Sequence, residues 1–215
     1  EENEELTGFE NEEILAEYQI YKTPGYVYMK GNVQIYSAGK QAADISAFPE
    51  GIAVAVGSEE DVPDICPDQT IDKVFTIENL TSFYRFKQEH SRWEEPDSVL
   101  IYLGGYHNRS RRNLLMQIYQ KLPDAQYYHF GDLDAGGFYI LEHLKRKTGI
   151  PFQMFQMDIE TLKKYEDYAK PLTENDKKRL MQLEKMELPD EERKLITYML
   201  QKGIKLEQEC ISESQ

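Results

Sequence analysis

The sequence has only two cysteines, Cys66 and Cys210, and they form no CxxC pair. Neither a disulfide framework nor a thiolate zinc site is indicated, and a reducing, cytoplasmic environment is expected. No run of about eighteen apolar residues occurs, so the sequence predicts no transmembrane helix and no membrane partner. The chain begins at Glu1 without a leader-like segment, and we expect it to be the C-terminal part of a longer protein.

Several catalytic motifs are also missing. The four histidines show no HExxH spacing, and neither a Walker lysine motif nor a GxGxxG motif occurs. A zinc hydrolase and nucleotide-dependent motor or redox chemistry therefore have no support. With 40% hydrophobic and 12% aromatic residues, the chain has enough apolar material for a core, and a folded globular protein is expected.

Net positive charge is lacking as well, because the formal net charge is −14. A polyanion is repelled by a protein of the same sign, which argues against loose coating of nucleic acid. The charge is uneven, however. Residues 1–17 hold eight acids and no base, whereas residues 80–157 hold ten bases and eight acids. The one basic segment also contains the best candidate chemistry.

The first 70 residues are expected to form an acidic helix followed by a small β region. Residues 1–20 have helical apolar spacing, and the alternation over 26–35 around Gly31 and Asn32 predicts a β-hairpin. Residues 52–56 could add a strand. The segment 57–70, with clustered acids and two prolines, resembles a loop or linker, so a domain boundary is placed near residue 70.

From residue 71 to residue 157, short apolar runs alternate with helical patterns. The runs lie at 73–78, 98–103, 127–131 and 152–157. This order predicts an α/β domain whose parallel sheet, of about four strands, is covered by helices on both faces. Residues 158–215 read only as helices, including a capping box at 173–176 and a helix ending at Gly203. They are expected to form a helical extension that packs on the core.

Three carboxylates follow strands of this predicted sheet. Glu78 ends the first strand, and Asp132 and Asp134 follow the third. Ligands of open parallel sheets bind at the carboxyl ends of the strands, where these side chains would meet. Because crowded carboxylates repel one another unless a cation neutralises them, the pattern predicts a Mg²⁺ site. Acids after a strand are also common helix N-caps, but the glycines at 136–137 favour close approach of a phosphate.

Three arginines, Arg109, Arg111 and Arg112, follow the second strand and are expected at the same edge. Arginine holds a phosphodiester by two parallel hydrogen bonds, so these residues are candidate DNA contacts. The alternative for Arg111 and Arg112 is that they are exposed residues in the first turn of a helix. The basic run at 145–147 is explained at least as well by the dipole at a helix C-terminus.

The order of strands and acids over residues 72–157 resembles the toprim domain of topoisomerases, primases and related nucleases. More narrowly, the segments 75–83 (FTIENLTSF) and 130–138 (FGDLDAGGF) resemble the C-terminal domain of the JetD family, a subunit of the Wadjet anti-plasmid system. That family is in turn similar to the A subunit of topoisomerase VI. Residues 105–112 match its Gly-Tyr-Pro-Asp-x-x-Thr-Arg pattern only in Gly105, Tyr106 and Arg112, and Lys205 with Glu207 echoes its C-terminal Lys-x-Glu.

The resemblance implies a toprim fold and Mg²⁺-dependent DNA cleavage in bacterial defence, with Mn²⁺ as a substitute. It assigns Asp132 and Asp134 to the metal and Glu78 to acid/base catalysis or further metal ligation, with Glu207 as a further candidate acid. Water is the expected nucleophile. The full-length protein is expected to act as a homodimer that cuts plasmid DNA presented by a condensin-like (SMC-type) Wadjet complex.

Two other functions stay open at this point. One is a non-catalytic toprim-like module that binds DNA or a partner. The other is a topoisomerase VI-like DNA-breaking subunit whose tyrosine nucleophile lies outside this chain. A primase-like or RNA-processing toprim protein is disfavoured by the details shared with topoisomerase VI.

Overall fold

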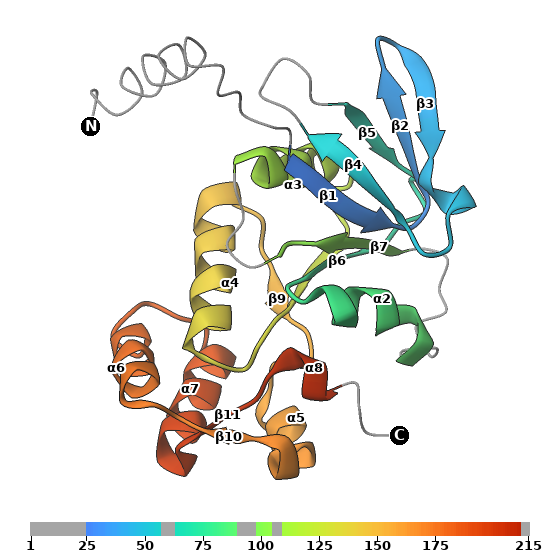
Figure 1. The fold of residues 1–215 in the computed structure, drawn as a ribbon. Helices are drawn as coiled ribbons and strands as arrows, with labels where there is room; N and C mark the ends of the chain where they lie inside the picture. Colours follow the sequence, from blue (N-terminus) through green and yellow to red (C-terminus); the bar gives the residue numbers. More distant parts are fainter. Residues whose placement is uncertain (1–24, 57–62, 90–97, 105–108, 212–215) are drawn as a thin grey trace, which may run out of the picture.

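The computed structural model describes residues 25–56, 63–89, 98–104 and 109–211, and its centre is a six-stranded sheet (Figure 1). The strand order across the sheet is β4-β1-β7-β6-β8-β9. The acidic helix expected over residues 1–20 lies outside the described residues. The strands of the sheet are β1 (Gly25–Lys30), β4 (Ile52–Val56), β6 (Lys73–Ile77), β7 (Ser98–Tyr102), β8 (Gln126–Phe130) and β9 (Gln153–Met154).

The predicted α/β class is confirmed. Strands β7, β6, β8 and β9 are parallel neighbours, as expected from the four apolar runs. Helices alternate with them along the chain, which is the arrangement that parallel strands require. These helices are α2 (Leu80–Glu89), α3 (Arg109–Lys121) and α4 (Ala135–Thr148).

The predicted hairpin around Gly31 is wrong. Strand β1 pairs antiparallel with β4 on one side and β7 on the other, so both of its edges are used within the central sheet. Gly31 has φ +123°, and a Cβ there would lie 2.4 Å from the carbonyl oxygen of Ser98. The chain passes close to the start of β7 at this point, and the next strand lies outside the central sheet and does not pair with β1.

That next strand belongs to a second, antiparallel sheet of order β3-β2-β5. Its strands are β2 (Val33–Ser37), β3 (Lys40–Asp44) and β5 (Asp64–Pro67), and a short 3₁₀ helix, η1 (Ile45–Ala47), follows β3. Strand β5 lies in the segment 57–70, which was predicted to be loop or linker. Proline is tolerated in this strand because Pro67 is the last residue of β5, where it lies opposite Val33 of β2.

The C-terminal part is mainly helical, as predicted. Thr173 and Asp176 form the expected capping box, and Gly203 ends a long helix in the left-handed conformation. Two short strands were not predicted, and they pair antiparallel with each other. The elements are α5 (Ile159–Lys164), η3 (Glu166–Tyr168), β10 (Lys170–Pro171), α6 (Glu174–Leu183), α7 (Asp190–Lys202), β11 (Ile204–Lys205) and α8 (Gln208–Ile211).

Apolar side chains cover both faces of the central sheet. On one face, Val99 and Ile101 of β7 pack with α3, α4 and the small sheet. On the other, Phe75 of β6 and Leu100 of β7 pack with α2 and the C-terminal helices. The strands are therefore fixed from both sides, which makes their carboxyl ends a rigid support. Within the described residues, no helix has the length and apolar character to cross a membrane.

Candidate functional site

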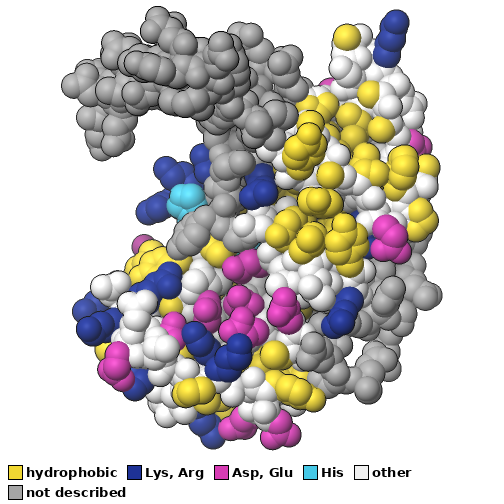
Figure 2. Space-filling model, viewed as in Figure 1, with side chains coloured by type: hydrophobic (Ala, Val, Ile, Leu, Met, Phe, Trp, Pro, Cys, Tyr) yellow, Lys and Arg dark blue, Asp and Glu magenta, His cyan; other side chains and the backbone are white. Residues whose placement is uncertain are grey.

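The structure brings the predicted carboxylates of β6 and β8 together at one edge of the sheet. These strands are parallel neighbours, with Ile77 opposite Phe130, so Glu78 and Asp132 follow them side by side. The backbone N–H of Asp132 points to Oε2 of Glu78 at 3.5 Å, at the outer limit of a hydrogen bond. Figure 2 shows acidic side chains gathered in the middle of this face of the molecule.

Glu78 lies in a half-buried position beside other acids. Burial is the main cause that raises its pKa to about 7, and the negative charge of Asp132 adds to the effect. Asp134 and Glu207 contribute further repulsion. A Cβ on residue 131 would lie 2.7 Å from Oε2 of Glu78, so a larger residue there would displace this carboxylate. The site therefore concentrates negative charge where solvent screens it poorly.

Asp132 is also half-buried, and burial raises its pKa to about 6. The backbone N–H of Gln208 donates to Oδ1 of Asp132 at 2.7 Å and acts against that increase. Nearby Asp134 and Glu207 raise it further. The hydrogen bond uses one of the two carboxylate oxygens, and the other keeps its lone pairs for a further donor or a cation.

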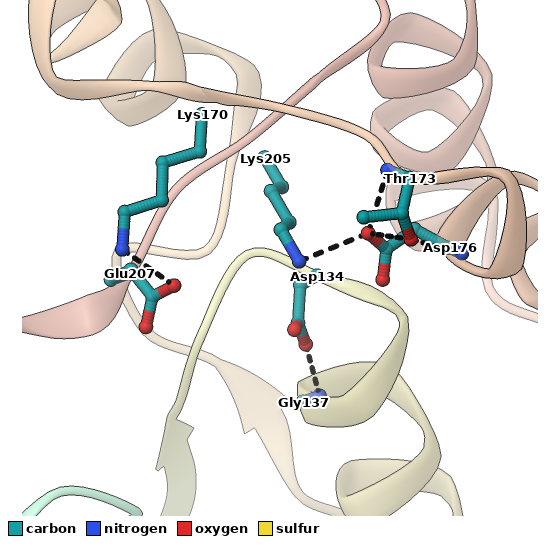
Figure 3. Close-up of polar contacts among 7 residues, drawn as sticks. All are labelled: Asp134, Gly137, Lys170, Thr173, Asp176, Lys205 and Glu207. Carbon is teal, nitrogen blue, oxygen red and sulfur yellow. Dashed lines mark hydrogen bonds and ion pairs between the residues drawn. The ribbon is translucent and has the colours of Figure 1, made fainter.

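Asp134 caps helix α4. Its Oδ1 accepts a hydrogen bond from the backbone N–H of Gly137 at 2.8 Å (Figure 3). A Cβ on residue 137 would lie 2.2 Å from the carbonyl oxygen of Asp132, so only glycine fits there. The capping alternative is thus confirmed for Asp134. One carboxylate oxygen remains outside the cap hydrogen bond, so capping and ligand binding do not exclude each other.

Gln208 connects the two acidic strand ends, and no sequence motif predicts this role. Its side chain is fully buried: Nε2 donates to the carbonyl oxygen of Phe130 at 3.0 Å, and Oε1 accepts from the backbone N–H of Asn79 at 2.9 Å. Together with its backbone bond to Asp132, this glutamine joins the residue after Glu78, the end of β8 and helix α8. The isolated bridge between Leu133 and Leu206 holds the same C-terminal segment against the site.

Glu207 and two lysines form ion pairs in the C-terminal part beside the site, and Figure 3 draws them together with Asp134. Lys170 pairs with Glu207 at 3.1 Å, and Lys205 pairs with Asp176 at 2.9 Å. The charge of Glu207 acts on both Glu78 and Asp132, so the structure places this residue near the site. Both lysines are engaged by acids of the C-terminal part.

The carboxylates offer the hard oxygen donors that Mg²⁺ and Mn²⁺ prefer, and their crowding is relieved by a cation. In this structure, the described carboxylates do not form a complete coordination site for one ion. Among the described residues, no three His, Cys, Asp or Glu side chains are grouped closely enough to hold one metal ion. The donor set therefore fits the predicted metal, whereas ion binding requires side chains at this edge to turn toward a common point.

The predicted arginines are only partly described. Arg111 and Arg112 lie half-buried in the first turn of α3, after the carboxyl end of β7. Arg109 begins α3, but its side chain lies outside the described residues, as do residues 105–108 of the preceding loop. A hollow of about 240 Å³ between residues 69–72 and 121–125 lies at the opposite edge, next to the first residues of β6 and β8, and does not belong to this site.

The family model described as "Wadjet protein JetD, C-terminal" matches residues 60–215, which includes the three carboxylates and Gln208. The chain belongs to the JetD C-terminal family. It is 28% identical over 204 residues to a protein named "Wadjet protein JetD" from Bacillus cereus (strain Q1). That alignment covers 94% of this chain and 48% of the relative, so the JetD-like chain spans about half the length of the curated protein it matches.

Proposed function

We propose that this chain is the catalytic part of a JetD-like protein of a Wadjet anti-plasmid system. In this proposal the domain is of the toprim type and cleaves DNA in a reaction that depends on Mg²⁺ or Mn²⁺. The observation that carries the proposal is the convergence of Glu78, Asp132 and Asp134, from two neighbouring parallel strands, at one edge of the sheet. Family membership, with a relative named for the Wadjet system, supports the biological role.

In the proposed site, Asp132 and Asp134 would hold the metal, and the backbone N–H groups of Gln208 and Gly137 occupy only one oxygen of each carboxylate. Bound there, a divalent cation stabilises charge on phosphate oxygens and activates an attacking water. Glu78 lies beside Asp132 on the adjacent strand end, so it is assigned proton transfer or additional ligation. Gly136 is half-buried and leaves room for a phosphate at the helix N-terminus of α4, whereas Gly137 is buried and its N–H donates to Asp134.

The remaining parts of the proposal concern DNA and partners. Arg109, Arg111 and Arg112 contact the DNA backbone from the start of α3. The full-length protein acts as a homodimer and receives plasmid DNA from a condensin-like complex. Water is the proposed nucleophile, and a tyrosine from outside this chain is the alternative expected of a topoisomerase VI-like subunit.

A second candidate is a non-catalytic module that binds DNA or a partner. The observation that favours it is the arrangement of the carboxylates: Asp134 already serves as a helix cap, and the described residues hold no finished metal cluster. In that case the acids stabilise the fold and bind no metal with useful affinity.

Cleavage of supercoiled plasmid by the full-length protein, together with its partner complex, tests the first proposal. We expect nicking or linearisation with Mg²⁺ or Mn²⁺ that is lost in EDTA and in the variants Asp132→Ala and Asp134→Ala. Asp158→Ala is a matched control, because Asp158 caps helix α5 in the same way but lies outside the acidic site. Cleavage that persists in the double variant Asp132→Ala/Asp134→Ala would overturn the assignment of the site.

Calorimetric titration with Mn²⁺ separates the two candidates. The catalytic proposal expects binding that disappears in Asp132→Ala and persists in Asp158→Ala. Absence of binding to the wild-type protein, in the presence and in the absence of DNA, favours the non-catalytic module.

A further inference from the structure

A group of basic side chains lies where the start of α3 meets the last turns of α4. Helices α3 and α4 contact each other, and Arg112 of α3 lies within electrostatic range of His143 of α4. Arg146 and Lys147 follow in the last turn of α4, and both are exposed. These four residues (Arg112, His143, Arg146 and Lys147) are called the α3–α4 basic patch. Figure 2 shows Lys and Arg side chains around a histidine on the face that carries the acidic site.

The neighbouring Lys145 does not belong to this patch. It forms ion pairs with Glu142 at 2.8 Å and with the buried Glu192 of α7, which turn it toward the C-terminal helices. The basic run at 145–147 therefore divides into one lysine that is paired with acids and two exposed cations. For Arg146 and Lys147, a favourable interaction with the helix dipole explains the charge but not its concentration beside Arg112.

The lowered pKa of His143 is consistent with several positive charges close to this side chain. Burial is the largest cause of its lowered pKa. The positive charges of Arg112, Arg146 and Lys147 lower it further. Positive charges from two different helices thus act on the same point, although the whole chain has a net charge of −14. A local field of this sign attracts a polyanion even when the net charge does not.

The position of the patch relative to the acidic site suits a DNA duplex. Asp134 caps the N-terminus of α4, whereas Arg146 and Lys147 lie in its last turn. At 1.5 Å per residue, the two ends are separated by roughly 15–20 Å along the helix. A turn of B-form DNA measures about 34 Å, so this separation is about half a turn. A duplex with one phosphate at the carboxylates can present another part of its backbone to the patch.

The geometry points to the α3–α4 basic patch as a contact surface for the phosphate backbone of duplex DNA, about half a helical turn from the acidic site. This inference rests on the proposed function for the nature of the ligand. It extends the proposed DNA contacts from the arginines at the start of α3 to the last turn of α4, and it assigns Arg146 and Lys147 to binding and not to the chemical step. The contacts are to phosphates and carry no sequence preference.

The test is the salt dependence of binding to a 30-base-pair DNA duplex, measured by fluorescence anisotropy of the labelled duplex in EDTA. EDTA separates binding from any metal-dependent cleavage. We expect Arg146→Ala/Lys147→Ala to weaken binding about tenfold at 100 mM NaCl and to reduce the slope of log K against log salt by about 2, because each lost phosphate contact removes about 0.9. The matched control is Lys163→Ala/Lys164→Ala, two exposed lysines in the last turn of α5. We expect the control to retain the wild-type affinity and slope.

Three results with the DNA duplex overturn the inference: no salt-dependent binding by the wild-type protein, an unchanged slope in Arg146→Ala/Lys147→Ala, or an equal loss in the control pair. The inference is also overturned if Arg146→Ala/Lys147→Ala loses as much affinity for a polyglutamate peptide as for DNA, because the patch then binds acidic proteins. The proposed function fails separately. If Asp132→Ala leaves cleavage intact while the patch variant loses its salt slope, the catalytic assignment is wrong and the contact surface stands.

Discussion

Replacement of Gln208 by alanine is the perturbation that most directly tests how the acidic edge is held together. The side chain is fully buried, and its two hydrogen bonds run to different strand ends. Alanine removes the acceptor for the backbone N–H of Asn79, which then lacks that partner. The carbonyl oxygen of Phe130 loses one donor but keeps the backbone N–H of Glu78 at 3.0 Å.

These losses set the expected magnitude. A buried donor left without its acceptor costs about 1–3 kcal/mol, and loss of the second bond costs about 1 kcal/mol. The free energy of unfolding should therefore fall by about 2–4 kcal/mol. For a chain of this size, each kcal/mol lowers Tm by about 2–4 °C, so we expect a decrease of roughly 5–15 °C.

Thermal unfolding followed by circular dichroism measures the change, and Gln201→Ala is the matched control. Gln201 is an exposed glutamine near the end of α7, and its replacement is expected to change stability by less than about 0.5 kcal/mol. Amide hydrogen exchange should also become faster in residues 204–211 of Gln208→Ala. Equal Tm values for the two variants, with unchanged exchange in this segment, would refute the view that Gln208 fastens α8 to the site.

Two further predictions concern the same edge. Gly137→Ala places a Cβ 2.2 Å from the backbone oxygen of Asp132 and should lower the free energy of unfolding by about 2 kcal/mol or more. In the control Gly136→Ala, the Cβ lies 3.0 Å from a side-chain oxygen of Asp134, so the loss should be much smaller. Equal urea midpoints for the two variants would contradict this. The second concerns pH in the absence of divalent cations. The pKa of Glu78 is about 7 in the folded state, so the folded protein binds a proton at Glu78 more tightly than the unfolded chain does. Protonated Glu78 therefore favours folding at pH 5.5. About 2 kcal/mol of this contribution to the free energy of unfolding is lost as the pH rises to 7.5. Urea unfolding should show that Glu78→Gln gains stability relative to wild type over this interval, and a constant difference would contradict the pKa assignment.

The parallel part of the fold could be predicted because its signals are local. Strands buried on both faces have continuous apolar sequences, and β6, β7 and β8 end close to the predicted residues. The acids that follow them were placed correctly relative to one another by a general property of parallel sheets. Each of these inferences needed only a few consecutive residues and the alternation of strands with helices.

The failures came from contacts between distant segments. The sequence around Gly31 has a hairpin pattern, but the pairing of β1 is decided by the available edges of β7 and β4, which local residues do not specify. Strand β5 is defined by its antiparallel pairing with the second edge of β2, a contact between segments about 30 residues apart. In the site, Gln208 lies 76 residues from Asp132 along the chain, and a glutamine in a short helix carries no local signal of that contact.

The structure also shows where the acidic and basic side chains lie relative to one another. The carboxylates of the sheet edge and the basic residues of α3 and α4 occupy one face in Figure 2. Net acidity therefore disfavours loose coating of DNA, but it is compatible with a strand held by a basic surface and led to an acidic site.

We propose that Glu78, Asp132 and Asp134 form a binding site for a divalent cation. The most direct measurement is an anomalous difference map from crystals of this chain soaked in Mn²⁺. We expect a peak between the carboxylates of Asp132 and Asp134, with Glu78 turned toward it, and no such peak in Asp132→Ala crystals. A map without a peak at this edge, or with Mn²⁺ bound only elsewhere, would contradict the claim.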